Sequence, residues 1–233
     1  MTAFVLVPGA GGQAWYWHRV VPLLRGLGHD AVAVELPAAD DTAGLAQYAD
    51  AIVAAAGDRD DVVLVAQSMG GMSAPLACDR LPVSAIVLVN AMIPVPGETP
   101  GDYWANTGQD AARRALDVRE GRGPDAEFDL LVHFFHDVPA DVTAEAMRHE
   151  PAQSGTPFGE PWPLDAWPDV PTRVLSGRED RLFPLEYQTR LARERLGLPA
   201  EPIPGGHLGA LSRPDDLVAH LTARAGAPAR PRS

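Results

Sequence analysis

The sequence predicts an α/β domain with a mostly parallel sheet of about six strands flanked by helices, and three observations lead to this prediction. Short apolar runs recur along the chain and are continuous rather than alternating, as in strands that are buried on both faces. Stretches with helical periodicity separate the runs, which is typical of repeated strand–helix–strand units. The 233 residues, 46% of them hydrophobic, are enough for one domain with a sizeable core.

The expected strands follow one another at regular intervals. The first ends at Pro8 and Gly9, which stop the apolar run. Val, Leu and Ile dominate the others, except for a weaker final run that ends before Pro204. The six predicted strands are Ala3–Val7, Ala31–Glu35, Val62–Ala66, Ala85–Val89, Arg173–Leu175 and Glu201–Ile203.

Helices are expected between these strands, each with one apolar stripe. The clearest is Thr42–Ala56, where Thr42 can cap the start and Gly57 the end. Pro75 predicts a kink in the helix that should follow Ser68. The other predicted helices are Trp17–Leu27, Tyr187–Leu196 and Asp215–Ala225.

The alternation stops between Asn90 and Val170, where Pro and Gly divide the chain and no convincing strand is found. We expect a small helical cap insertion here, approximately residues 94–168, over the C-terminal edge of the sheet. It belongs to a single domain of residues 1–225, and the Pro- and Arg-rich tail, 226–233, is expected to be disordered. The helical patches of the cap are Asp110–Glu120, Phe128–Phe135 and Thr143–Arg148.

Composition limits the partners that this chain can have. Its formal net charge of −12 repels phosphate backbones and anionic lipid, so we expect no nucleic acid and no membrane partner. All 19 basic residues are Arg, which excludes Schiff-base and lysine-base chemistry. Cys78 is the only cysteine, so no intrachain disulfide can form. With no signal-peptide pattern and no membrane-spanning run, we expect a cytoplasmic monomer or homodimer that acts on a small-molecule substrate.

The segment around Ser68 predicts a catalytic nucleophile. A buried strand runs into this serine, and two glycines and a helix follow it. Such a sharp turn holds the hydroxyl above the sheet and requires small residues two positions before and after, here Ala66 and Gly70. The helix behind Ser68 also presents backbone N–H groups to developing negative charge. The alternative is a serine that only caps a helix after a strand.

A glycine-rich loop, Pro8–Gly12, follows the first strand. In a hydrolase such a loop supplies one donor of the oxyanion hole, and the residue after the nucleophile supplies the other. We therefore expect the backbone N–H groups of Ala10 and Met69 to form an oxyanion hole.

The same loop also fits a dinucleotide-binding fingerprint. Gly9, Gly11 and Ala14 match its spacing, and Glu35 ends the next strand, where a ribose-binding acid would stand. Pro8 and a cluster of aromatic residues crowd the place where a cofactor helix should begin, and this alternative gives Ser68 no role. We expect no cofactor.

Asp180 and His207 are the expected partners of Ser68. Asp180 follows a strand and a glycine turn, and His207 stands on a glycine-flanked loop after the last strand. His207 would take the proton of Ser68 and return it to the leaving group, while Asp180 would orient the imidazole and stabilise the imidazolium. These three residues are the predicted catalytic triad.

Alternatives stay open for each of these residues taken alone. Asp180 could simply cap the following helix, and His207 could be an ordinary loop histidine. Glu179 is the alternative acid. Asn90, at the end of another strand, carries an amide and cannot serve as the acid.

Together these motifs resemble a known family. The matching segments are Val5–Ala10, Trp15–Trp17, Val21–Leu24, Gly28–His29, Gln67–Gly71, Ala91–Pro94 and Gly206–His207. The chain resembles the small α/β-hydrolases of the group that contains plant methylesterases and hydroxynitrile lyases, with their bacterial relatives. The resemblance implies an α/β-hydrolase fold without the two outermost N-terminal strands, a small helical cap, and small carboxylic esters or cyanohydrins as substrates. Pro8 stands where the family usually has His, and the chain lacks the Lys of the lyases, which favours hydrolysis.

The substrate pocket is expected where the cap covers Ser68. For any single aromatic residue of the cap, packing within the cap is the alternative role. His133 and His136 share a helix face and could bind a metal ion, but no third ligand is obvious, so we expect no metal. The pocket residues that we expect are Gly11, Gln67, Trp104, Phe134, Phe135 and Trp162, with Tyr103, Phe128 and Phe158 as further candidates.

The sequence thus predicts a serine hydrolase that cleaves a small, fairly hydrophobic carboxylic ester, thioester or lactone through an acyl-enzyme on Ser68. A lyase, cyclase or C–C bond hydrolase that uses His207 as general base is the alternative on the same scaffold. An NAD(P)-binding oxidoreductase and a non-catalytic ligand-binding protein are less favoured.

Overall fold

A computed structural model describes residues 2–123, 125–149 and 152–223 of the chain. Six strands form one sheet in the order β2-β1-β3-β4-β5-β6, and every neighbouring pair is parallel. The predicted parallel sheet of six strands is therefore confirmed. The strands are β1 (Ala3–Val7), β2 (Asp30–Ala33), β3 (Val62–Gln67), β4 (Val83–Val89), β5 (Thr172–Gly177) and β6 (Ala200–Ile203).

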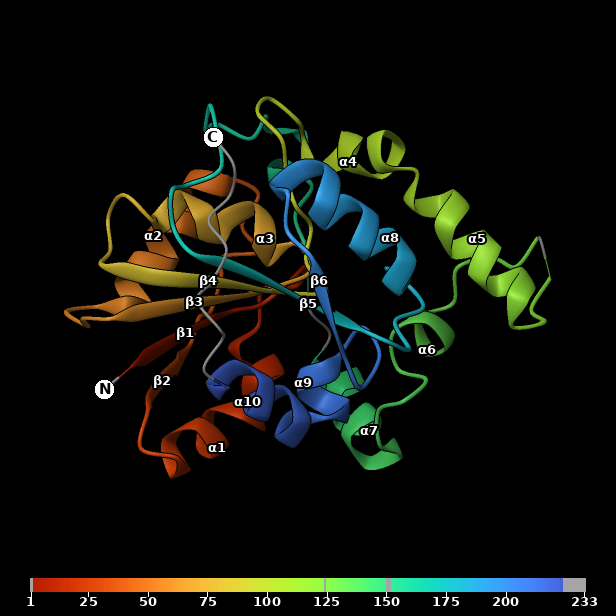
Figure 1. Ribbon diagram of the computed structural model, residues 1–233, viewed down its shortest axis with the longest axis horizontal. Coiled ribbons are helices and arrows are strands. Elements are labelled where there is room, and N and C mark those ends of the chain that lie inside the picture. Colours follow the sequence, from red (N-terminus) through yellow and green to blue (C-terminus); the bar gives the residue numbers. More distant parts are fainter. Residues whose placement is uncertain (1, 124, 150–151, 224–233) are drawn as a thin grey trace.

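Helices cover both faces of the sheet (Figure 1). Successive residues of β3 show why its apolar run is continuous. Leu64 packs into the same core as Ile52 of the helix α2 on one face, whereas Val65 packs with Leu24 of α1 on the other. One face is covered by α2 (Leu45–Ala56), α3 (Gly70–Ser73) and α8 (Leu185–Leu191), and the other by α1 (Val20–Gly26), α9 (Gly209–Ser212) and α10 (Pro214–Thr222).

Two helix ends differ from expectation for local reasons. The hydroxyl of Thr42 donates to Asp40 Oδ1 at 2.7 Å, so it does not cap α2. The cap is Gly44, whose backbone N–H donates to the side-chain oxygen of Gln47 at 2.9 Å. The helix predicted at Trp17–Leu27 is divided into a 3₁₀ turn, η1 (Ala14–Trp17), and α1.

Two further predicted helices change from α-helical to another helical geometry along their length. The helix after Ser68 changes at Pro75 into a 3₁₀ turn, η2 (Ala74–Ala77), at the place where a kink was expected. The helix predicted at Tyr187–Leu196 begins earlier, as α8, and ends in one π-helical turn, η4 (Ala192–Leu196). Residues 224–225 of the last predicted helix and the predicted disordered tail, 226–233, lie outside the described residues.

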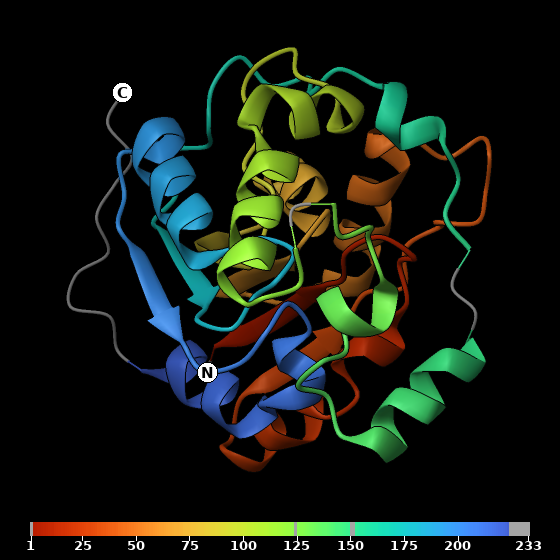
Figure 2. The ribbon, with the colours of Figure 1, turned by 90° about the vertical axis from the view of Figure 1, so that its right-hand side faces the viewer.

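The chain between β4 and β5 contains helices and turns but no strand among its described residues. Figure 2 shows α5, α6 and α7 in front of the edge where the strands end. The sequence missed α4, although Thr99 caps it by accepting from Asp102 N at 2.9 Å and Pro100 takes the favoured first position. The elements of this segment are α4 (Pro100–Thr107), α5 (Gln109–Arg119), α6 (Leu130–His133), α7 (Ala140–His149) and the 3₁₀ turn η3 (Thr156–Gly159).

A buried ion cluster holds the cap helices α5 and α6 together. The carboxylate of Asp117 is fully buried and lies 2.7 Å from both Arg113 Nη1 and Arg122 Nε. His133 Nε2 lies 3.4 Å from the same carboxylate. Burial acts to raise the pKa of Asp117, but hydrogen bonds from Arg122 and His133 outweigh it and hold this pKa below its usual value.

None of the helices in the described part of the chain has the length and hydropathy that crossing a bilayer demands. The longest, α2, has 12 residues, and its polar face points away from the sheet.

Candidate active site

Ser68 stands on a strained turn between β3 and α3. Its φ angle is +50°, in the left-handed region that residues with a side chain rarely adopt, at a typical cost of about 1–3 kcal/mol. The turn is held by two backbone bonds, because the carbonyl of Ser68 accepts from Gly71 N at 3.1 Å and from Met92 N at 2.9 Å. The hydroxyl is therefore presented at the C-terminal end of β3.

Two glycines make this turn possible by letting backbones approach closely. A Cβ on Gly70 would lie 2.7 Å from the carbonyl oxygen of Pro8. A Cβ on Gly71 would collide with the carbonyl oxygen of Met92. The requirement for a small residue at position 70 was expected from the sequence, whereas the tighter contact at position 71 was not.

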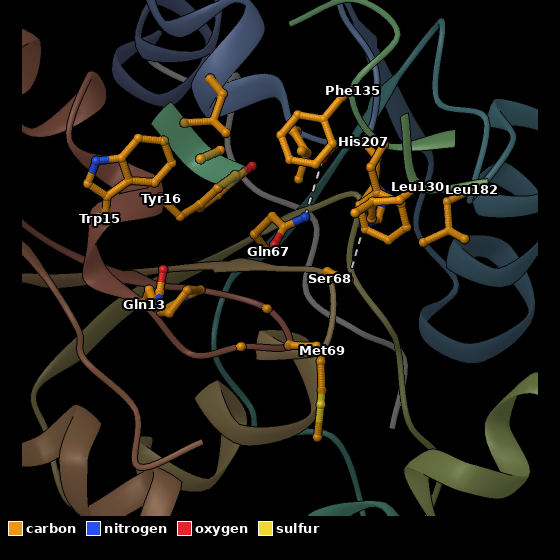
Figure 3. A pocket seen from close by; sticks show the side chains of 18 of the residues that line it. Gln13, Trp15, Tyr16, Gln67, Ser68, Met69, Leu130, Phe135, Leu182 and His207 are labelled. Atoms are coloured by element: carbon orange, nitrogen blue, oxygen red, sulfur yellow. Dashed lines mark hydrogen bonds between the residues drawn. The ribbon is translucent and has the colours of Figure 1, made fainter. Parts of the chain in front are cut away.

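The structure brings Ser68, His207 and Asp180 together. His207 Nε2 lies 3.1 Å from Ser68 Oγ (Figure 3). His207 Nδ1 lies 2.9 Å from Asp180 Oδ2. His207 is fully buried and Asp180 is 1% exposed. The second carboxylate oxygen, Asp180 Oδ1, accepts from Leu182 N and Phe183 N at 2.8 Å each. Asp180 is thus both the cap of its turn and the partner of the imidazole.

Aromatic and polar side chains fix His207 from several sides. Phe134 and Phe183 meet its ring edge-on, with centroid distances of 4.9 and 5.2 Å. Its carbonyl oxygen accepts from Gln67 Nε2 at 3.3 Å and from Asn90 Nδ2 at 3.2 Å. The imidazole is held in the orientation that both of its hydrogen bonds need.

Asn90 connects three strand ends beneath the site. It is fully buried and has a φ angle of +47°. Its amide nitrogen donates to Gly206 O at 2.9 Å, and its amide oxygen accepts from Gly177 N at 2.7 Å. Sequence reasoning dismissed Asn90 because it is not an acid, and so missed this role. Asn is one of the few residues that tolerate a positive φ, which was the available signal.

Glu179, the alternative catalytic acid, and Glu35, the alternative ribose-binding acid, both bind backbone N–H groups instead. Glu179 accepts from Gly205 N at 2.6 Å, whereas the imidazole of His207 is bonded to Asp180. Glu35, the expected ribose-binding acid of a dinucleotide site, accepts from Ala14 N at 2.6 Å and thereby caps η1.

Ala10 and Met69, the residues expected to form the oxyanion hole, both line the pocket. Within the described part of the chain, neither of their backbone N–H groups donates to a protein group. The neighbouring N–H of Gly11 is occupied, because it donates to Gln153 Oε1 at 2.9 Å. Gln153 also donates to the hydroxyl of Tyr48 at 3.1 Å. This glutamine fixes the loop while the two N–H groups stay available.

A pocket of about 400 Å³ opens above Ser68. Gly11, Gln67, Trp104, Phe134 and Phe135 line it, as does Phe158. Its lining residues, all of them described, include no Asp, Glu or Arg. The site therefore suits a neutral and largely apolar molecule.

The prediction that Trp162 lines the pocket was wrong. Trp162 is 2% exposed and lies in the core, where its indole N–H donates to Met72 O at 3.0 Å. Tyr103 is also buried in the core, whereas Phe128 is 51% exposed and stacks on His133 with a centroid distance of 5.2 Å. None of these three aromatic residues lines the pocket.

Sequence reasoning did not assign pocket roles to several residues next to the oxyanion loop and in α6 and α7. Trp15 and Tyr16 directly follow that loop, which was the available signal, but they were used only as a family motif and as an argument against a cofactor helix. The lining residues that were missed are Gln13, Trp15, Tyr16, Met92, Leu130, Ala146, Met147, Leu182, Leu208 and Leu211.

The two histidines considered as metal ligands have separate surroundings. His133 faces Asp117, and the ring of His136 lies against Gly206. Asp137 accepts from Gly206 N at 2.7 Å, so this segment holds the loop that precedes the catalytic histidine candidate. The described residues contain no group of three or more His, Cys, Asp or Glu side chains that could hold a metal ion.

Comparisons with known proteins agree with this architecture. Probable esterase PIR7A from Oryza sativa subsp. indica is 42% identical over 112 residues, which are 42% of this chain and 42% of that protein. The chain thus matches about two fifths of the length of this relative. Methylesterase 7 from Arabidopsis thaliana is 27% identical over 247 residues, and the match covers 94% of both proteins.

Solved structures extend the likeness to the whole fold. The crystal structure of polyneuridine aldehyde esterase has a TM-score of 0.74 at 23% identity and covers 95% of this chain and 98% of its own. A family model described as "Alpha/beta hydrolase family" matches residues 4–221, from β1 to the last turn of α10. Because this match spans the sheet, the cap and all three residues of the predicted triad, we conclude that the chain belongs to the alpha/beta hydrolase family.

Proposed function

We propose that this protein is a carboxylic ester hydrolase with Ser68 as its nucleophile. The observation that carries the proposal is the continuous hydrogen bonding from Ser68 Oγ through His207 to Asp180 at the floor of an apolar pocket. The names of the relatives, an esterase from rice and a methylesterase from Arabidopsis thaliana, support the same activity.

In the first half of the reaction, Ser68 Oγ attacks the ester carbonyl carbon while His207 Nε2 accepts the hydroxyl proton. The N–H groups of Ala10 and Met69 stabilise the negative charge on the carbonyl oxygen of the tetrahedral intermediate. The intermediate collapses with cleavage of the carbon–oxygen bond. His207 gives its proton to the departing alcohol, which leaves the acyl group on Ser68.

In the second half, water attacks the acyl carbon and His207 accepts one of its protons. Collapse of this intermediate breaks the bond to Ser68 Oγ, which takes the proton back and frees the carboxylic acid. The net reaction converts one ester and one water into one acid and one alcohol. Asp180 acts throughout by orienting the imidazole and stabilising its charged form.

The surroundings of Ser68 limit the substrate. Apolar side chains dominate the pocket, and none of its lining residues carries a guanidinium or a carboxylate. An anionic substrate would also meet a chain with a net charge of −12. We therefore assign the site to a neutral, fairly hydrophobic ester, thioester or lactone. Acyl transfer of this kind needs neither a metal ion nor a cofactor.

The test combines turnover with covalent labelling. We expect the protein to hydrolyse p-nitrophenyl esters, and a fluorophosphonate probe to modify Ser68, as located by peptide mass spectrometry. Ser68→Ala should remove both. Ser84→Ala, which changes a β4 hydroxyl bonded to Val62 O, is the matched control and should keep both.

Two outcomes would contradict the proposal. The first is ester turnover that persists in Ser68→Ala. The second is enzymatic activity that needs His207 but proceeds without labelling of Ser68, which would favour the lyase, cyclase or C–C hydrolase alternative.

A further inference from the structure

Tyr16 is the one phenol among the residues that line the apolar pocket above Ser68. It belongs to η1, directly after the loop that carries Ala10. Figure 3 shows its hydroxyl pointing inward, toward the part of the pocket where Gln67 and Phe135 lie. A polar group is thus presented inside a pocket whose other walls are mostly hydrocarbon.

The ring of Tyr16 is held by packing. It meets the fully buried Trp17 at a centroid distance of 4.8 Å and packs against the apolar cluster of Val138, Leu208 and Leu211. These contacts restrict the rotamers of the side chain, which favours one position of the hydroxyl before a ligand arrives.

The hydroxyl of Tyr16 has an unused proton. Its oxygen accepts from Ala210 N at the long distance of 3.5 Å. Among the described residues, no protein group accepts the hydroxyl proton in return. A tyrosine hydroxyl is both donor and acceptor, so this one can still donate a hydrogen bond to a group in the pocket.

Burial raises the pKa of Tyr16 well above its usual value, and the nearby carboxylates of Asp180 and Asp137 act in the same direction. The hydroxyl therefore stays neutral and keeps its proton throughout the physiological pH range. It is a hydrogen-bond donor rather than an acid–base group.

We propose that Tyr16 is a specificity determinant: its hydroxyl donates a hydrogen bond to a second oxygen acceptor, a carbonyl or ether, that the substrate carries outside its scissile ester. An all-carbon substrate would displace water from this hydroxyl and leave the donor unpaired, which is unfavourable inside an apolar pocket. The inference rests on the proposed ester hydrolysis at Ser68 and adds the chemical class of the substrate.

The test uses matched esters that differ in a single position. In p-nitrophenyl esters of one chain length, each methylene beyond the α-carbon is replaced in turn by an ether oxygen or a carbonyl. A second series places the same replacements in the alcohol part and is followed by acid release. Rates of hydroxide-catalysed hydrolysis correct for the intrinsic reactivity of each ester.

We expect one placement to raise the wild-type kcat/KM about tenfold over the all-carbon ester, which corresponds to about 1.4 kcal/mol, mainly through a lower KM. Tyr16→Phe should abolish this gain, so that its kcat/KM values for the oxygen-bearing and the all-carbon ester differ by less than about threefold. Tyr187→Phe is the matched control. It removes a buried hydroxyl that donates to Thr107 Oγ1 at 2.9 Å and does not line the pocket, so this variant should retain the preference.

Two outcomes would overturn the inference. In the first, the wild type prefers no placement of oxygen. In the second, the preference survives in Tyr16→Phe, with or without a common loss of kcat/KM for all esters. A melting curve of Tyr16→Phe shows whether the variant is folded. Failure of the proposed function is distinguishable, because the wild type would then neither turn over the all-carbon ester nor label at Ser68.

Discussion

Phe134 of the cap packs edge-on against the imidazole of His207, with the ring centroids 4.9 Å apart and the ring planes at 76°. A cap side chain therefore restrains the proposed general base directly. An aromatic pair of this geometry is worth about 0.5–1.5 kcal/mol beyond the area it buries.

We expect Phe134→Ala to lower kcat/KM by about 3- to 30-fold, because the imidazole of His207 loses an aromatic contact and the pocket loses one of its lining side chains. Leu131→Ala, in the helix α6 that directly precedes Phe134, is the control, since Leu131 is 52% exposed and does not line the pocket. Steady-state kinetics on one p-nitrophenyl ester compares the two variants. Equal effects would show that the cap as a whole, not the ring contact, supports the activity.

The assignment of the acid can be tested with two isosteric changes. Asp180→Asn removes the charge that stabilises the imidazolium and favours the wrong tautomer of His207, so we expect kcat to fall by about 10⁴. Glu179→Gln alters a carboxylate that binds Gly205 N instead, so we expect a change below about threefold. A larger loss in Glu179→Gln than in Asp180→Asn would reverse the assignment.

Substitutions of Asn90 test whether a residue outside the pocket lining helps to position His207. Asn90→Asp turns an amide that faces the carbonyls of Gly206 and His207 into a carboxylate, so we expect the free energy of unfolding to fall by about 1–3 kcal/mol and kcat to drop with it. Denaturant unfolding and kcat at saturating ester are the measurements. Asn90→Gly and Asn90→Ala both lose the amide, and the difference between them isolates the cost of the positive φ. Normal kcat in all three variants would refute the positioning role.

The elbow glycine at position 71 should tolerate no side chain. Because a Cβ there would collide with Met92 O, we expect Gly71→Ala to destabilise the protein by about 3 kcal/mol or more, or to prevent folding. Gly26→Ala is the matched control, since nothing lies within 4 Å of its would-be Cβ and Ala is the better helix former by about 1 kcal/mol. Thermal melting of the two variants should give shifts of opposite sign.

Stability should fall in acid partly through Asp117, whose pKa is lowered in the folded protein. The contribution is fully present above the unfolded pKa near 3.8 and is lost as the pH falls through the lower folded value. We expect Asp117→Asn to be less stable than wild type near neutral pH, because Arg113 and Arg122 lose their buried partner, and to show a smaller decline below about pH 4.

Urea unfolding between about pH 7 and pH 2.5 measures this difference in slope. Asp50→Asn, which breaks an exposed pair with Arg80, is the control and should follow the wild-type curve. Parallel curves for wild type and Asp117→Asn would contradict the prediction.

The sheet and the positions of Ser68, Asp180 and His207 could be predicted because parallel strands leave a strong local signal. Each of the three residues follows an apolar run that ends in glycine or a turn. Since the carboxyl ends of parallel strands share one edge, order along the chain was enough to bring them together.

The cap could not be predicted in the same detail. An aromatic residue in a short amphipathic segment is expected to be buried, but the sequence does not say against which neighbour. Trp162 and Phe134 look alike in this respect, yet Trp162 packs on Met72 while Phe134 reaches His207. Asn90 was missed for a related reason, because its role depends on carbonyls that lie 116 and 117 residues further along the chain.

The chain leaves the sheet at the end of β4 and re-enters it on β5, the strand next to β4. The two ends of the intervening segment are therefore neighbours, so a change in its length need not alter the order of the strands. A replacement segment would still have to restore its contacts with the scaffold, among them Phe134 on His207, Gln153 on Gly11, Asp137 on Gly206 and Trp162 in the core. We expect variation in this segment to change the range of substrates, because it contributes much of the lining above Ser68.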